Sequence, residues 1–325
     1  MTIQTNPLPL AGVFSGDLMK RWFLPTVLLL FLPVAHAQMF GALEMFIIRG
    51  QYRLATQAAN KKLSEDPDNV ELHAIIGVAW AKNSFFADAL GAFSLCPGSV
   101  YYENQGIEAH ADALRSVGRG EEAVVLRLQR LLDPSLNEGR TMKVLLGAVD
   151  DLREVGDLAG AMAFAEQAEA LFPRSPMAHA VMADIYLDAG DLDAADQAIW
   201  AMSRMGGTSR GAAVQARRAL LDGDYTEADA VLESARQFRT PTVRLAALRA
   251  EVLRQGGDPH TAAELLERNR WRALEAPELL QVRLMVYADM EDTESAAYWK
   301  HIAITRYNDN SLVQSGLAYL EAAEL

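Results

Sequence analysis

Four aspartates surround a single glycine in the segment DAGDLDAADQAI. Asp188, Asp191, Asp193 and Asp196 supply carboxylate oxygens, the ligands that a hard cation such as Ca²⁺ prefers. Their order lacks the paired spacing and the bidentate glutamate of an EF-hand loop. An aspartate directly after a glycine also suits a turn between two helices, where it caps the second helix. The sequence therefore allows a metal loop or a turn, and it favours the turn.

Other residue types with catalytic potential lack the partners that catalysis needs. The six histidines form no H-E-x-x-H pair, and none stands beside a cysteine at zinc spacing. The glycine-rich segment 205–214 lacks the Lys-Ser/Thr ending of a phosphate loop, which favours an ordinary loop. Cys96 has no C-x-x-C partner, so we interpret it as a packed small residue, with an intermolecular disulfide as the alternative. We therefore predict no catalytic residue, no metal and no cofactor.

Composition indicates a helical chain that does not bind nucleic acid. The formal net charge is −13, so a phosphate surface of nucleic acid or of an anionic membrane would repel the chain. Half of the residues are hydrophobic, and strong helix formers dominate. Runs of alternating β-branched residues, which would predict a sheet, are missing from the sequence.

The N-terminal region has the organisation of a signal peptide over residues 19–37. Lys20 and Arg21 precede an apolar run, and an A-x-A cleavage motif ends at Ala37. The apolar run is shorter than the roughly 20 residues that a membrane-spanning helix needs. We therefore expect cleavage after Ala37 and a periplasmic location, with an uncleaved anchor in the inner membrane as the alternative. Residues 1–18 are expected to be an over-called extension.

One short phrase recurs along the chain, with a glycine or its equivalent five residues before an alanine. Gly156-Asp157 and Gly190-Asp191 are clear copies. The alanines lie 33 or 34 residues apart, except for one interval of 38, and a period of this kind indicates a repeat architecture. They are Ala55, Ala89, Ala123, Ala161, Ala195, Ala228, Ala262 and Ala296.

This pattern resembles the tetratricopeptide repeat family, whose unit is a helix–turn–helix of 34 residues. Small residues twelve positions before the alanines and large apolar ones nine before them also match the family, as at Gly77 and Trp80. The resemblance implies an all-α fold, a right-handed α-solenoid of about eight repeats over residues 38–308. Residues 309–325 are expected to form a C-terminal capping helix, with a docking tail as the alternative.

Some positions depart from the family pattern. Arg127 and Lys300 stand where the second helix should present an apolar side chain, which makes the third and eighth units less regular. Tyr101, Tyr102 and Trp271 could stack on a sugar or a peptide. Aromatic residues at repeat boundaries more often join neighbouring units, and we favour that role.

In the family, the first helices line a concave groove that binds partners. Carried over by position, the resemblance implies a groove that is acidic in its middle and rich in arginine toward the C-terminus, where it could hold an acidic segment. The alternative is that these positions are charged only because they face solvent. The groove residues are Glu108, Asp112, Asp150, Glu154, Asp184, Asp188, Arg210, Arg217, Arg244 and Arg254, with Arg115, Arg153 and Glu251 beside them.

The resemblance implies a non-enzymatic scaffold or assembly adaptor that binds an extended peptide or protein partner. Exported proteins of this family resemble assembly factors for secretion, pili, polysaccharide export or cytochrome maturation. We therefore expect a partner in the cell envelope, with peripheral association to a membrane complex. The alternative is a glycan-binding protein or the specificity subunit of a separate envelope enzyme.

Overall fold

The repeated Gly-Asp phrase forms the turn that the sequence predicts. In the computed structural model, Gly156 and Gly190 take the left-handed conformation, with φ angles of +79° and +75°. The carboxylates of Asp157 and Asp191 then accept hydrogen bonds from backbone N–H groups three residues later. Glycine ends one helix because it has no Cβ to oppose this φ, and the aspartate caps the next helix. The turn interpretation of the aspartate-rich segment is therefore confirmed.

Two degenerate copies of the phrase adopt the same turn without glycine. Ser84 has a φ of +65° and Glu291 a φ of +56°. A left-handed conformation costs a residue with a Cβ about 1–2 kcal/mol. The stacking of helices on both sides must therefore stabilise these two turns.

The structure describes residues 41–235, 243–268 and 276–324, and residues from Ala42 onward form one compact unit. The predicted signal peptide and Trp271 lie outside the described residues. The first helices of the successive pairs are α1 (Gly41–Ile48), α3 (Val70–Lys82), α5 (Ile107–Ser116), α7 (Glu138–Glu154), α9 (Pro176–Ala189), α11 (Ser209–Leu221), α13 (Val243–Gln255) and α15 (Pro277–Asp289). The second helices are α2 (Tyr52–Leu63), α4 (Phe86–Ser94), α6 (Gly120–Leu131), α8 (Leu158–Leu171), α10 (Leu192–Ser203), α12 (Tyr225–Ser234), α14 (Pro259–Arg268) and α16 (Thr293–Tyr307).

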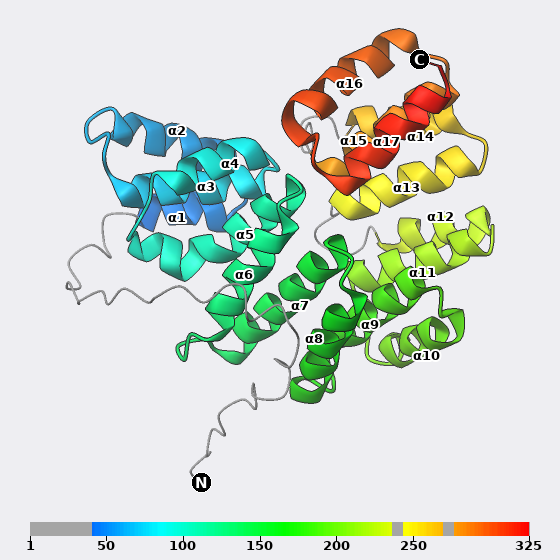
Figure 1. The fold of residues 1–325 in the computed structure, drawn as a ribbon, viewed down its shortest axis with the longest axis horizontal. Helices are drawn as coiled ribbons and strands as arrows, with labels where there is room; N and C mark the ends of the chain where they lie inside the picture. Colours follow the sequence, from blue (N-terminus) through cyan, green and yellow to red (C-terminus); the bar gives the residue numbers. More distant parts are fainter. Residues whose placement is uncertain (1–40, 236–242, 269–275, 325) are drawn as a thin grey trace. The chain divides into compact units, whose positions relative to one another are not determined.

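A short π-helix, η3 (Tyr102–Gly106), precedes α5, and α17 (Ser311–Ala322) follows the last pair. Helix α17 packs against α15 and α16, and Asn310 caps its N-terminus. The pairs follow one another along the chain in Figure 1, and the described residues contain no strand. None of the helices within those residues is both long enough and apolar enough to span a membrane. The fold is therefore the all-α helical-repeat solenoid that the sequence predicts.

The core lies where the alanine ladder predicts it. All eight ladder alanines are at most 1% exposed. Small residues on the first helices let the second helices approach closely, and Gly77 is the clearest case. A Cβ at Gly77 would lie 2.6 Å from the ring of Phe93. The apolar clusters join neighbouring pairs, so each unit completes the core of the next.

Several single-residue interpretations also have an outcome. Cys96 is buried, and burial raises the pKa of its thiol to about 11, as suits a packed residue that resists oxidation. Tyr102 packs on Phe93 and contacts His110 Nδ1 at 2.6 Å, so it joins neighbouring units. The pairs α5–α6 and α15–α16 form despite Arg127 and Lys300.

Candidate functional site

The predicted groove residues lie on the first helices, and most of them are paired with one another. Asp112, Asp150 and Asp184 occupy the same position of consecutive units, eleven residues before the ladder alanine. Arg210 and Arg244 share another position, eighteen residues before the ladder alanine and therefore about two helical turns nearer the N-terminus than the aspartate position. Stacking of the helices brings these positions of different units together. We call the resulting set the ionic network, which comprises Asp112, Arg115, Arg127, Asp150, Asp151, Arg153, Asp184, Asp188, Arg210, Arg217 and Arg244.

Asp184 on α9 is the centre of the ionic network. Its side chain is 0% exposed, and four arginines from three helices surround it. Nitrogen–oxygen distances are 2.5 Å to Arg217, 2.9 Å to Arg244, 3.1 Å to Arg210 and 3.4 Å to Arg153. Burial opposes ionisation of Asp184, but the attraction of Arg244, Arg210, Arg153 and Arg217 outweighs it and lowers the pKa of this carboxyl.

Asp150 on α7 and Asp188 on α9 flank this centre. Arg210 binds Asp150 with two parallel hydrogen bonds of 2.6 and 2.9 Å across 60 residues of sequence. Arg153 and Arg217 bind Asp188 at 2.6 and 2.7 Å. Burial disfavours the charged form of Asp150, yet Arg210 above all keeps its pKa below the usual value. Bidentate pairs of this kind fix the orientation of both partners.

Arg127 on α6 connects the network to the third unit. Its guanidinium donates to Asp151 Oδ2 at 2.6 Å and also pairs with Asp112. Gly147 makes room for it, because a Cβ there would lie 2.3 Å from a guanidinium nitrogen. Burial raises the pKa of Asp151 to about 6, although Arg127 and Arg115 oppose that shift. Arg127, which departs from the family pattern, is therefore a structural member of the ionic network.

The remaining predicted residues lie at the margins of the ionic network. Glu108 lies 3.2 Å from Lys143 Nζ, and Glu154 accepts a hydrogen bond from Ser311. Arg254 pairs with Glu251 at 2.7 Å and with Asp289 at 2.8 Å. They extend the pattern of paired charges along the first helices.

The charges of the predicted groove are engaged within the chain. The resemblance implied an acidic middle and an arginine-rich C-terminal half that could hold an acidic segment. The structure instead pairs Arg210, Arg217 and Arg244 with Asp150, Asp184 and Asp188 of the same chain. Charges of opposite sign on the first helices of nearby units lie within ion-pair distance and attract each other. The two patches of opposite sign therefore neutralise one another.

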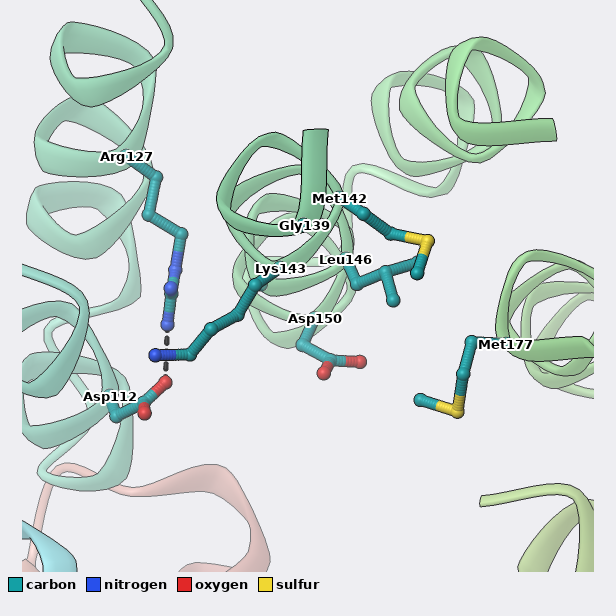
Figure 2. Close-up of a pocket in the computed structure, with 9 residues that line it drawn as sticks. Asp112, Arg127, Gly139, Met142, Lys143, Leu146, Asp150 and Met177 are labelled. Atoms are coloured by element: carbon teal, nitrogen blue, oxygen red, sulfur yellow. Dashed lines mark hydrogen bonds and ion pairs between the residues drawn. The ribbon is translucent and has the colours of Figure 1, made fainter. Parts of the chain in front are cut away.

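A pocket of about 340 Å³ lies beside the ionic network, between α5, α6, α7 and α9. Figure 2 shows its two sides: Met142, Leu146 and Met177 on one, and Asp112, Arg127 and Lys143 on the other. An apolar surface beside fixed charges can bind an amphipathic side chain or backbone segment. This arrangement suits recognition, because its charged groups already hold one another in place.

A second pocket of about 600 Å³ lies among α14, α15 and α16. Acidic and aromatic side chains line it, including Glu264, Glu294, Tyr287, Tyr298 and Trp299. The ring of Trp299 is 2% exposed. The guanidinium of Arg283 lies 4.0 Å from its centroid. Tyr287 is also buried, so Tyr298 presents the accessible ring.

Known proteins resemble this chain in fold, but their sequences are hardly similar to it. No protein-family model and no curated protein matches the chain. Among solved structures, a tetratricopeptide repeat protein from Parabacteroides merdae is 13% identical, with a TM-score of 0.49, over 89% of this chain and 99% of its own. The Cut9–Hcn1 tetramer of the APC/C is 13% identical, with a TM-score of 0.50, over 87% of this chain and 54% of the matched chain. Yeast Tom70 is 12% identical, with a TM-score of 0.50, over 84% of this chain and 58% of its own.

The matches to Cut9 and Tom70 reach the similarity that indicates a shared fold, and both are tetratricopeptide repeat proteins. Identities this low establish the fold alone. The chain spans little more than half the length of these two matched chains.

Proposed function

We propose that this chain is a non-enzymatic protein-interaction scaffold of the bacterial periplasm, which holds an extended segment of a partner protein against its first helices. The observation that carries the proposal is the pocket in which Met142, Leu146 and Met177 lie beside the ionic network. Methionine side chains are flexible and polarisable, so they adapt to varied apolar groups. The fixed charges beside them would select the polar neighbours of such a group.

The ionic network argues for selection by shape rather than by net charge. Its arginines already hold carboxylates of the chain, so an acidic segment would have to displace Asp150 or Asp184 to bind them. Displacing a buried partner leaves an unpaired charge, which is costly. The partner is therefore expected to bring an apolar anchor for the methionine side of the pocket.

The second pocket supports a protein partner over a glycan. A sugar ring binds through a stacked aromatic face, and the faces of Trp299 and Tyr287 are buried. Tyr298 is 47% exposed, and its ring packs edge-on against Trp299 with centroids 5.0 Å apart. The predicted signal peptide supports an envelope location, where the partner would belong to a secretion, pilus, polysaccharide-export or cytochrome-maturation machine.

Photo-crosslinking in cells tests the scaffold. A benzophenone amino acid at Lys143, which is exposed at the pocket, is expected to capture one envelope protein. The matched control is the same group at Glu166, which is exposed on the second helix α8. Met177→Asp should abolish the adduct without changing the helical circular dichroism. Equal adducts from both positions, or none from Lys143, would contradict the proposal.

Processing is tested separately. Mass spectrometry of the chain recovered from a periplasmic fraction is expected to find Gln38 as its first residue. A chain recovered only from the membrane fraction with Lys20 and Arg21 still attached would support the anchor instead.

A further inference from the structure

The turn between α5 and α6 contacts the turn between α16 and α17, far along the chain. Asn310 donates a hydrogen bond from Nδ2 to the carbonyl of Ser116 at 3.1 Å, across 194 residues of sequence. Its Oδ1 accepts from Val313 N at 3.1 Å and caps α17. Asn310 is 2% exposed, so the bond to Ser116 is shielded from water. In Figure 1 the two elements differ in colour, blue-green for α5 and red for α17.

Gly118 shows how closely the two turns approach. Its φ is +86°, and a Cβ added there would lie 2.1 Å from the carbonyl oxygen of Asp309. The equivalent glycines Gly156, Gly190 and Gly223 have the same conformation and open space at this position. The same repeat position is therefore a plain turn in these units and a contact surface in the third.

Further contacts surround this pair of turns. Ser311 Oγ donates to a carboxylate oxygen of Glu154 on α7 at 2.7 Å. Phe86 and Val117 pack against the apolar cluster formed by α13 to α17. The C-terminal units therefore touch the second, third and fourth units of the same chain.

These contacts are additional to those between neighbouring units. In a helical-repeat protein each unit contacts its neighbours along the chain, and those interfaces carry the stability. The contact between the two turns is an addition to that series, and hydrogen bonds make up much of it. Removing it leaves every neighbouring interface intact.

We infer that the two turns form a latch, defined as Ser116–Arg119 with Asn308–Ser311, which closes the first-helix face and opens to load a partner. The loading half of this inference rests on the proposed function. Glu154 carries a latch contact and also belongs to the first-helix face, so closure fixes that face next to the ionic network. A closed latch therefore restricts how a long segment can enter.

The matched pair Gly118→Ala and Gly156→Ala tests the latch. Both variants strain a left-handed turn, but only the first forces a Cβ into Asp309. Hydrogen exchange of residues 308–313 is expected to rise about five- to tenfold in Gly118→Ala, the equivalent of one lost hydrogen bond, and to stay unchanged in Gly156→Ala. Unchanged exchange in both variants would overturn the latch.

A second variant removes the hydrogen bond without adding bulk. Asn310→Asp keeps the oxygen that caps α17 but loses the donor to Ser116. Asn137→Asp is its control, because Asn137 caps α7 with the same geometry. Spin labels at Glu121 and Ala318 should report one distance in the wild type and a longer one in Asn310→Asp alone. An unchanged distance would contradict the latch.

A separate measurement tests whether opening of the latch speeds the binding of a partner. In Gly118→Ala, adduct formation from position 143 should proceed several-fold faster than in Gly156→Ala. Faster exchange with an unchanged adduct rate would refute the gating role and leave the scaffold intact. Faster exchange with no adduct in any variant would refute the scaffold and leave the latch intact.

Discussion

The alanine ladder and the ionic network arise from the same repeat, but apolar contacts form the first and charged contacts form the second. The alanine ladder is apolar, nearly devoid of exposed surface and formed by small residues from adjacent helices. The ionic network lies on the first helices, apart from Arg127 on α6, and it includes Asp184, a fully buried carboxylate held by four arginines. The ladder repeats almost unchanged from unit to unit, whereas the network takes its charges from the third to the seventh units, and each of these contributes a different set.

The difference separates what stabilises the fold from what makes one face of it unique. A dry contact between alanines depends on close approach alone, so the same residue serves every unit. A buried ion pair gains little over an apolar pair of similar size, but losing one partner is costly. The network therefore specifies which helices lie together, and its removal should affect stability more than damage to any one ladder position.

Acidification should produce the largest effect on the network. Burial raises but arginines lower the pKa of Asp150 and Asp184, and their pKa values end below the ordinary one. A carboxyl with a depressed folded pKa stabilises above its unfolded pKa of about 4, and that stability is lost as the pH falls. Asp151, with a pKa of about 6, acts in the opposite sense and loses stability as the pH rises from about 4 to 6.

The unfolding free energy from urea titration should therefore fall steeply as the pH drops below about 4, and it should also fall gently as the pH rises from about 4 to 6. Asp151→Asn should remove only the gentle slope. A flat profile across the acidic range would show that the network carries no linked stability.

The largest effect of one substitution is expected at the centre of the network. Asp184→Asn leaves four arginines short of a charged partner and should cost about 3–5 kcal/mol of unfolding free energy. Asp196→Asn is the control, because the pair of Asp196 with Arg218 is exposed and should cost less than about 1 kcal/mol. Equal losses in the two variants would remove the distinction between buried and exposed pairs.

Enlarging a ladder alanine should have an intermediate effect. Ala161→Leu adds three carbons to a fully buried contact and should cost about 1–3 kcal/mol. Ala159→Leu, in the exposed first turn of the same helix, should stay within about 0.5 kcal/mol. Thermal and chemical denaturation measure both, and a tolerated Ala161→Leu would mean that the ladder is loosely packed.

The smallest effect concerns the turn caps. Asp191→Ala removes the acceptor for the N–H of Ala194 and should cost about 1 kcal/mol. Asp193→Ala changes an exposed carboxylate two residues away and should cost about 0.5 kcal/mol or less. Similar losses from both would indicate that these aspartates stabilise the helix through their charge near its N-terminus, rather than through the cap hydrogen bond.

The sequence predicted the ladder and turns because their causes are local. Gly190 and Asp191 act within one turn, and Ala195 recurs at a fixed distance from them. The ionic pairs were missed because they join distant positions, such as Arg210 and Asp150, which are 60 residues apart and skip an entire unit. Spacing within a unit contains no information on such pairs.

One signal of the network was present in the sequence. Arg127 stands where an apolar residue belongs, and a buried charge needs a partner. Asp151 lies on the next first helix, at 2.6 Å from it in the folded chain. Arg127 pairs with Asp151 rather than with Asp150 because of the side of α7 that faces α6. That orientation follows only from the packing of the helices.

Self-neutralisation of the inner face has a kinetic consequence. The network contains five carboxylates and six guanidinium groups and so has a net charge of +1, whereas the whole chain has −13, which leaves −14 on the rest of the chain. Approach of a partner is then governed by the acidic remainder, which repels anionic proteins and attracts cationic ones over a Debye length. Added salt should slow encounter with a basic partner while leaving the lifetime of the bound complex nearly constant. The surface that attracts the partner and the surface that holds it would thus be different parts of the protein.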